Sequence, residues 1–130
     1  MGPLPGDGCP EEVRNPLYKK LKEQNSGLKY NCTLEGVSLV TATFKNEREY
    51  LSLYENFTAE VQHLWHTEKN TYPRTYGDDK PWKYLNITNF INNATAQWNS
   101  KLTNEPVKDK TQVGCYFDVD FNYTLVCSFA

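Results

Sequence analysis

Two histidines and a glutamate lie close together in the segment VQHLWHTE. His63 and His66 are three residues apart, and Glu68 follows His66 after one residue. On a helix, that spacing of histidines can bring two imidazoles to one metal ion. The pattern does not match that of the zinc peptidases, and no third ligand is indicated. We therefore expect no metal site and interpret both histidines as polar residues on the outer side of an amphipathic helix.

The remaining groups that could support catalysis are also better explained without it. Asp118 and Asp120 form a carboxylate pair of the kind that performs acid and base catalysis. They flank a predicted turn, however, where charged side chains serve solubility. The sequence has no glycine-lysine phosphate loop and no serine-centred nucleophile elbow. We therefore predict that the protein is not an enzyme and needs no cofactor.

The C-terminal stretch from 112 to 129, QVGCYFDVDFNYTLVCSF, has the pattern of a β-hairpin. Its apolar side chains alternate on both sides of a turn, which is the period of half-buried strands. Pairing Cys115 with Cys127 also places Phe117 opposite Leu125, and it leaves a turn of three residues. Opposite residues on antiparallel strands lie within the range of a disulfide. The pattern predicts a hairpin held by that bridge.

Cysteines and glycosylation motifs indicate an oxidising, secretory environment. The four cysteines allow three pairings, and Cys9 with Cys32 is what remains once the hairpin is bridged. There are also five Asn-x-Ser/Thr motifs, too many for chance in so short a chain. Their acceptors, which we predict to be glycosylated, are Asn31, Asn56, Asn86, Asn93 and Asn122. We expect a secreted, extracellular glycoprotein.

Length and charge are those of one soluble domain. The chain has 130 residues and a formal net charge of -2, which gives no reason to expect binding to nucleic acid or insertion into a membrane. Residues 1–8 contain no apolar segment of a signal peptide, so we expect a mature form with a disordered or cloning-derived start. Residues 9–130 are predicted to form a single domain.

Before the hairpin, the pattern is mainly helical. Apolar residues predict amphipathic helices over 9–25, 46–68 and 87–102, the last with Asn86 or Thr88 as its cap. Residues 28–30 read as a short extended segment and 70–82 as a loop. The apolar run 34–44 fits either a buried strand or a buried helix. Helices followed by a hairpin indicate an α+β domain.

Several short motifs resemble those of the CAP superfamily, especially the secreted venom-allergen-like or activation-associated proteins of parasitic nematodes. LKYNCTLE, VQHLWHTE, NATAQW, and VGC followed by LVCSF occur in the family's order, over most of residues 27–129. The resemblance implies a reduced CAP-like sandwich with helices flanking a small antiparallel sheet, and it implies the Cys115–Cys127 bridge again. A second resemblance, to the surface antigens of coccidian parasites, fits five glycosylation motifs less well.

The metal site of the family looks broken in this chain. CAP proteins usually line a cavity with two histidines and two glutamates, and of these only Glu68 can be placed. Where the family has its second histidine, this sequence offers Asn92 or Asn93, and a neutral amide cannot replace an imidazole as a zinc ligand. We therefore expect the fold to be kept for its surface.

The resemblance and the secretory features lead to two functional hypotheses. The first is a secreted parasite effector or immunomodulator that binds a host protein without catalysis. The alternative is a carrier of a sterol, a fatty acid or another small apolar ligand, which would need an enclosed cavity. For the first hypothesis, aromatic residues with an arginine in a stretch without glycosylation motifs predict the contact surface. These residues are Tyr72, Arg74, Tyr76 and Trp82. Trp82 would otherwise close over the core.

Overall fold

A computed structural model describes residues 9–44, 61–71, 82–105, 107–119 and 121–130. Its elements follow the chain in a mixed α+β order: α1 (Glu11–Gln24), β1 (Lys29–Tyr30), α2 (Cys32–Phe44), β2 (Gln62–Lys69), α4 (Ile87–Leu102), β3 (Gln112–Val119) and β4 (Asn122–Phe129). The stretch 1–8, most of the helix predicted from residue 46 and most of the loop predicted from residue 70 lie outside the described residues. The α+β class is confirmed.

The strands form one sheet in the order β1-β3-β4-β2. β1 runs parallel to β3, whereas β3 with β4 and β4 with β2 are antiparallel. Cys115 lies opposite Cys127 and Phe117 opposite Leu125, so the predicted hairpin register is confirmed. A disulfide joins the two cysteines, also as predicted. Val119 pairs with Tyr123, so three residues connect the paired strands as predicted, and Asn122 already belongs to β4 because it pairs with Lys69 of β2.

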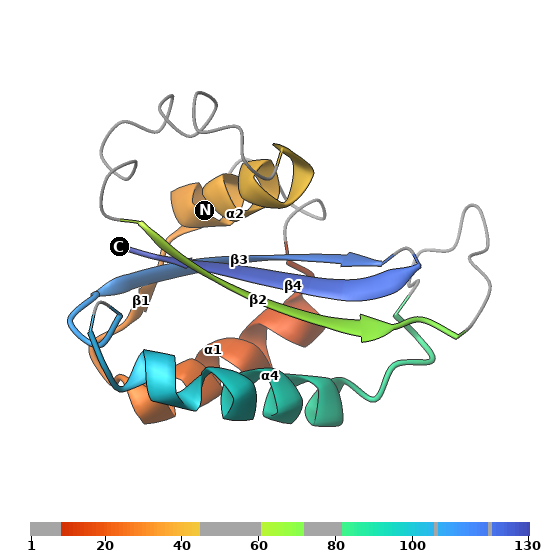
Figure 1. Ribbon diagram of the computed structural model, residues 1–130, viewed down its shortest axis with the longest axis horizontal. Coiled ribbons are helices and arrows are strands. Elements are labelled where there is room, and N and C mark those ends of the chain that lie inside the picture. The colour runs from red at the N-terminus through yellow and green to blue at the C-terminus, as the bar shows by residue number, and fades with distance from the viewer. Residues whose placement is uncertain (1–8, 45–60, 72–81, 106, 120) are drawn as a thin grey trace.

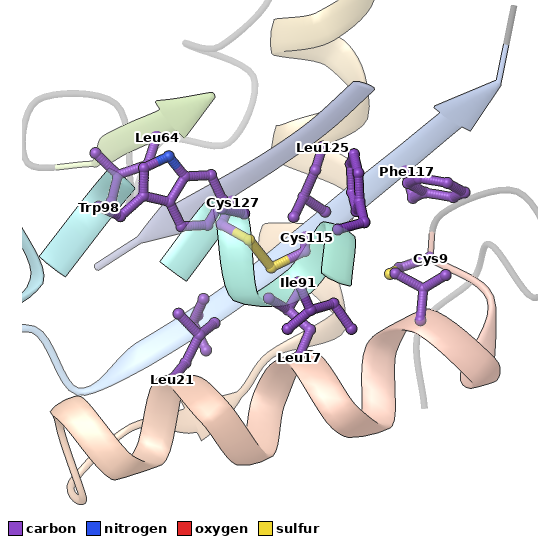
Figure 2. Close-up of a cluster of buried hydrophobic side chains, with 14 of the residues drawn as sticks. Cys9, Leu17, Leu21, Leu64, Ile91, Trp98, Cys115, Phe117, Leu125 and Cys127 are labelled. Carbon is purple, nitrogen blue, oxygen red and sulfur yellow. A yellow bond between two sulfur atoms is a disulfide. The ribbon is translucent and has the colours of Figure 1, made fainter. Parts of the chain in front are cut away.

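Helices cover the sheet on both faces (Figure 1). α2 lies on one face, and α1 with α4 lies on the other. The main core fills the space between the sheet and the α1–α4 pair (Figure 2), because every second side chain of β3 and β4 points to that side. The largest buried side chains of this core are those of Leu17, Leu21, Leu28, Phe90, Ile91, Trp98, Leu102, Leu125 and Phe129. Both amphipathic helices were therefore predicted on the correct segments.

Helix α2 resolves the ambiguity of the apolar run 34–44. Asn31 caps the helix, because its Oδ1 accepts from the backbone N–H groups of Thr33 at 2.7 Å and Leu34 at 3.3 Å. The helix lies very close to β3, where Gly114 offers no side chain to hold it away. A helix buried against a sheet in this manner can be apolar without a clear helical period.

The segment Gln62–Lys69 is a strand, so the helix predicted over 46–68 is wrong in this part. The spacing of Val61, Leu64 and Trp65 fits a helical stripe, but alternation fits the segment equally well. Leu64 and His66 are buried on the core side, while Trp65 between them is 37% exposed. Pairing with β4 along its whole length decides between the two patterns.

The predicted bridge between Cys9 and Cys32 is absent from the structure, where both residues are free cysteines. Cys9 is buried in the main core, where it lies near Phe117 (Figure 2). Cys32 opens α2, which packs on the opposite face of the sheet, and it is only half-buried. Pairing by elimination assumed that all four cysteines are bridged.

Candidate functional site

His66 is the centre of a polar cluster between β2 and α4. Its Nε2 lies 2.8 Å from Oε2 of Glu68, and its Nδ1 lies 2.6 Å from Oε1 of Gln97. Asn93 donates from Nδ2 to the same Glu68 oxygen over 3.2 Å. The edge of the imidazole meets the Phe90 ring at a centroid distance of 5.1 Å. Both nitrogens of a buried ring are thus held by neighbouring side chains, and Glu68 forms the solvent-facing side of the cluster.

His63 belongs to a separate chain of hydrogen bonds on the α2 face of the sheet. Its Nδ1 lies 2.8 Å from Ser128 Oγ, which lies 2.7 Å from Ser38 Oγ. Ser38 donates to the carbonyl oxygen of Gly114 over 2.9 Å. Because Ser38 uses its one hydroxyl proton there, Ser128 must donate to Ser38, and His63 must donate from Nδ1 to Ser128. All three hydrogen bonds can form together only if His63 donates to Ser128, Ser128 to Ser38, and Ser38 to the Gly114 carbonyl.

The two histidines therefore cannot share a metal ion. His63 pairs with Ser128 and His66 with Leu125 across β4, so their side chains point to opposite faces of the sheet. Our interpretation of both as residues on the outer side of a helix is wrong, since the segment is a strand and His66 is buried. Among the described residues, no three His, Cys, Asp or Glu side chains are grouped as metal ligands.

A third polar group lies around the buried carboxylate of Glu35. Its Oε1 accepts from the backbone N–H of Cys9 and from the hydroxyl of Tyr30, both over 2.9 Å. The Tyr30 oxygen in turn accepts from the backbone N–H of Cys115 at 3.2 Å. Burial raises the pKa of the Cys9 thiol well above its ordinary value of 9.0, and the Glu35 charge adds to the shift. Burial is likewise the main cause that raises the pKa of Tyr30. This network joins the start of α1 to α2 and β3.

The predicted glycosylation sites differ in their surroundings. Asn86, Asn93 and Asn122 are exposed, although Asn86 caps α4 by accepting from the N–H of Asn89. Asn31 is half-buried, and its Nδ2 donates to Oε1 of Gln112 while its Oδ1 caps α2. The fifth acceptor, Asn56, lies outside the described residues. No sugar is part of the structure, so occupancy stays a prediction.

The predicted contact residues are mostly beyond the described part of the chain. Tyr72, Arg74 and Tyr76 lie outside it, as does Asp120. Trp82 packs edge-on against Phe117 at a centroid distance of 6.5 Å. Its Nε1 also donates to Glu12 over 2.9 Å. Trp82 thus fits the alternative that it closes over the core.

The partners of the two histidines were missed by sequence reasoning. Gln97 lies on α4 and Ser38 on α2, and neither has a local signal that connects it with β2. Ser128 was part of the predicted hairpin, but its partner strand was taken for a helix. Recognising the alternation of Leu64 and His66 would have placed Glu68 beside His66 on the same face.

The three layers define the class of protein. The fold is similar to that of a crystal structure of NaASP2 with Zn2+, with a TM-score of 0.58 over 97% of this chain and 83% of that chain. At 12% sequence identity, this likeness shows the fold alone, the sandwich of the CAP superfamily. A search of curated proteins found no match.

The particular family follows from the sequence of nearly the whole chain. The model of the family Ancylostoma-associated secreted protein related, which is of the CAP type, matches residues 4–129. The chain therefore belongs to this family, and the resemblance to CAP proteins is confirmed. Family members are secreted proteins, and CAP proteins are generally non-catalytic and bind host proteins or small lipids. Of the described helices, none has the length and apolar character needed to cross a membrane.

Proposed function

We propose that the protein is a secreted parasite effector that acts by binding a host protein, without catalysis. Membership of a family of secreted parasite proteins supports this role. The main observation in its support is the set of hydrogen bonds that both histidines make within the fold. Among the described residues, His66 has both ring nitrogens bonded within the fold, and His63 has its Nδ1 bonded to Ser128.

The His66 cluster lacks a free nitrogen for proton transfer. A general base must reach the proton that it removes, directly or through one water molecule. Glu68 and Gln97 hold the two nitrogens of His66 at 2.8 and 2.6 Å. The cluster therefore serves to fasten α4 to β2 at the edge of the sheet.

The His63–Ser128 pair has the wrong direction for a catalytic dyad. In a serine hydrolase the histidine accepts the serine proton, which makes the serine oxygen nucleophilic. Here the count of protons requires His63 to donate to Ser128. Ser128 and Ser38 are moreover fully buried, so a substrate cannot reach either hydroxyl.

The donor set also does not fit the zinc ion of NaASP2. Glu68, to which one family ligand corresponds, is bonded to His66 and Asn93, and an amide is a poor zinc ligand. We expect no stoichiometric zinc binding at neutral pH in a calorimetric titration. One tight site that His66→Ala abolishes would contradict this expectation.

Affinity capture tests the proposed function. The glycosylated protein, secreted from eukaryotic cells, is used as bait in host serum and cell-surface extracts, and each captured protein is purified and measured directly for binding. The double variant Arg74→Ala with Tyr76→Ala should weaken binding by about tenfold or more, since aromatic residues and arginines are typical anchors of interfaces. Its thermal stability should match that of the parent protein.

Two results would contradict the proposal. The first is the absence of any captured protein that binds directly after purification. The second is a stoichiometric sterol or fatty acid found by mass spectrometry of an organic extract, which would favour the carrier hypothesis. A partner that binds the double variant unchanged would place the contact surface elsewhere.

A further inference from the structure

His63 and Trp65 stand side by side on the α2 face of β2. They are separated by one residue and therefore point to the same side of the sheet, about 7 Å apart along the strand. β2 is an outer strand of the sheet, while α2 packs over β3 and β4. Trp65 is 37% exposed and His63 is half-buried. A solvent-accessible indole thus lies next to an imidazole of fixed orientation.

The hydrogen bonds of His63 determine where its lone pair lies. Because Nδ1 donates to Ser128, the neutral ring carries its lone pair on Nε2. Burial lowers the pKa of His63 from 6.5, so the ring is neutral at physiological pH. Within the described part of the chain, Nε2 has no hydrogen-bond partner. The structure therefore holds an unused acceptor beside an aromatic face.

We propose that His63 and Trp65 form a binding site for an arginine side chain of a protein partner. The face of an indole ring attracts a cation, and a planar guanidinium stacks on it while keeping its N–H groups free to donate. A neutral imidazole with its lone pair on Nε2 accepts such a donor. This site rests on the proposed function, because it specifies the chemistry of the partner.

The first test is the position of the proton on the two histidines. In two-dimensional 1H–15N spectra of the ring nitrogens at neutral pH, His63 should show a protonated Nδ1 and an unprotonated Nε2. Ser38→Ala frees the Ser128 proton for His63 Nδ1, so this variant should move the His63 proton to Nε2. His66 makes no hydrogen bond to Ser38 or Ser128, so it serves as the internal control. A parent protein with the proton of His63 on Nε2 would overturn the proposal.

The second test uses a single amino acid as the probe. Nα-acetyl-arginine amide should shift the His63 and Trp65 side-chain resonances at least about fivefold more than Nα-acetyl-citrulline amide, its neutral isostere. Trp65→Val should remove most of this response, whereas Tyr84→Ala, at another exposed aromatic residue, should leave it unchanged. Equal shifts with both probes, or no shift at these residues, would overturn the proposal.

The probe experiment needs no partner, so it is independent of the proposed function. If a host protein is captured and Trp65→Val binds it as tightly as the parent does, the site inferred here is wrong while the proposed function stands. If the arginine probe binds but no host protein is found, the proposed function fails and the site stands.

Discussion

At the scale of single residues, three networks of polar side chains within the described residues each connect distant parts of the chain. His66 joins β2 to α4, the two serines join α2 to β4, and Glu35 joins α2 to the start of α1. A buried polar group without a partner is costly, so each network contributes more to the specificity of the fold than a surface contact does. These networks explain why chemically active residue types need not indicate catalysis.

Tyr30→Phe should lower the free energy of unfolding by about 2 to 3 kcal/mol. The change removes one donor from the buried Glu35 carboxylate and leaves the N–H of Cys115 without its acceptor. Tyr18→Phe is the matched control, because Tyr18 makes a single bond to the carbonyl of Leu28 and should cost about 1 kcal/mol. Urea unfolding measures the loss in free energy of unfolding for both variants. Equal losses would show that the Glu35 network adds nothing beyond one ordinary hydrogen bond.

The buried thiol of Cys9 should make the protein less stable at alkaline pH. In the unfolded chain the thiol ionises near its ordinary pKa of 9.0, whereas burial raises its pKa in the folded state. Above pH 9 the unfolded state therefore binds fewer protons than the folded state, and stability falls by up to about 1.4 kcal/mol per pH unit. Below pH 9 the thiol is protonated in both states, so its burial costs no stability in that range.

Comparison with Cys9→Ala isolates this effect. Urea unfolding under argon at several values between pH 8 and 10 should give a shallower decline for the variant than for the parent protein. Other groups that titrate in this range are common to both proteins and cancel in the difference. Parallel curves would mean that the Cys9 thiol is not buried as described.

At the scale of elements, a prediction from sequence was correct where the pattern fitted only one type of secondary structure. The hairpin combined alternation, register and a pair of cysteines, and α4 combined an apolar stripe with the Asn86 cap, so both were predicted correctly. The run that forms α2 is apolar on all sides and remained undecided. The apolar residues of 62–68 fit the period of a helix and that of a strand. Only pairing with β4, which the local sequence does not encode, makes this segment a strand.

The candidate site could be predicted even less well than the elements. Glu68 was recognised through its place in a family motif, but its neighbours come from α4, and the chain offers no local pattern for contacts between distant segments. The burial of Cys9 was equally hidden, because it follows from the packing of distant segments and not from spacing.

Gly114→Ala should displace α2 from the sheet. A Cβ at this position would lie 2.3 Å from the backbone nitrogen of Glu35 and 2.5 Å from backbone atoms of Asn31 and Leu34. None of these atoms can rotate away, so we expect a loss of about 3 kcal/mol or more in the free energy of unfolding. Gly27→Ala is the control, since its nearest neighbour would be a side-chain oxygen at 3.6 Å and its φ lies outside the left-handed region. Thermal and urea unfolding of both variants distinguish them, and a stable Gly114→Ala would contradict the close packing.

At the scale of the whole molecule, the layers divide the surface into parts with different accessibility. Asn86 and Asn93 lie on α4, and Asn122 lies at the hairpin end. Glycans at Asn86 and Asn122 would cover the start of α4 and one end of the sheet, whereas the amide nitrogen of Asn93 donates to Glu68 on the side of β2. The row of His63 and Trp65 lies on the opposite face, on the side of α2. Of the glycosylation motifs within the described residues, those of Asn86 and Asn122 would therefore obstruct a partner protein less there than over α4.

Asn31, by contrast, should be unglycosylated in the secreted protein. Its side-chain nitrogen, to which a sugar would be attached, donates to Gln112 of β3, and its oxygen caps α2. A sugar on this nitrogen would have to enter the junction of helix and sheet, so chains that carry one should fold poorly and be depleted from the secreted pool. Thr33→Ala removes this glycosylation motif and should leave the intact mass of the secreted glycoprotein unchanged, apart from the substitution itself. Thr88→Ala, which removes the motif of the exposed Asn86, should reduce the mass by one glycan. Loss of a glycan in Thr33→Ala would show that the sugar is accommodated at Asn31 and that the cap has another geometry.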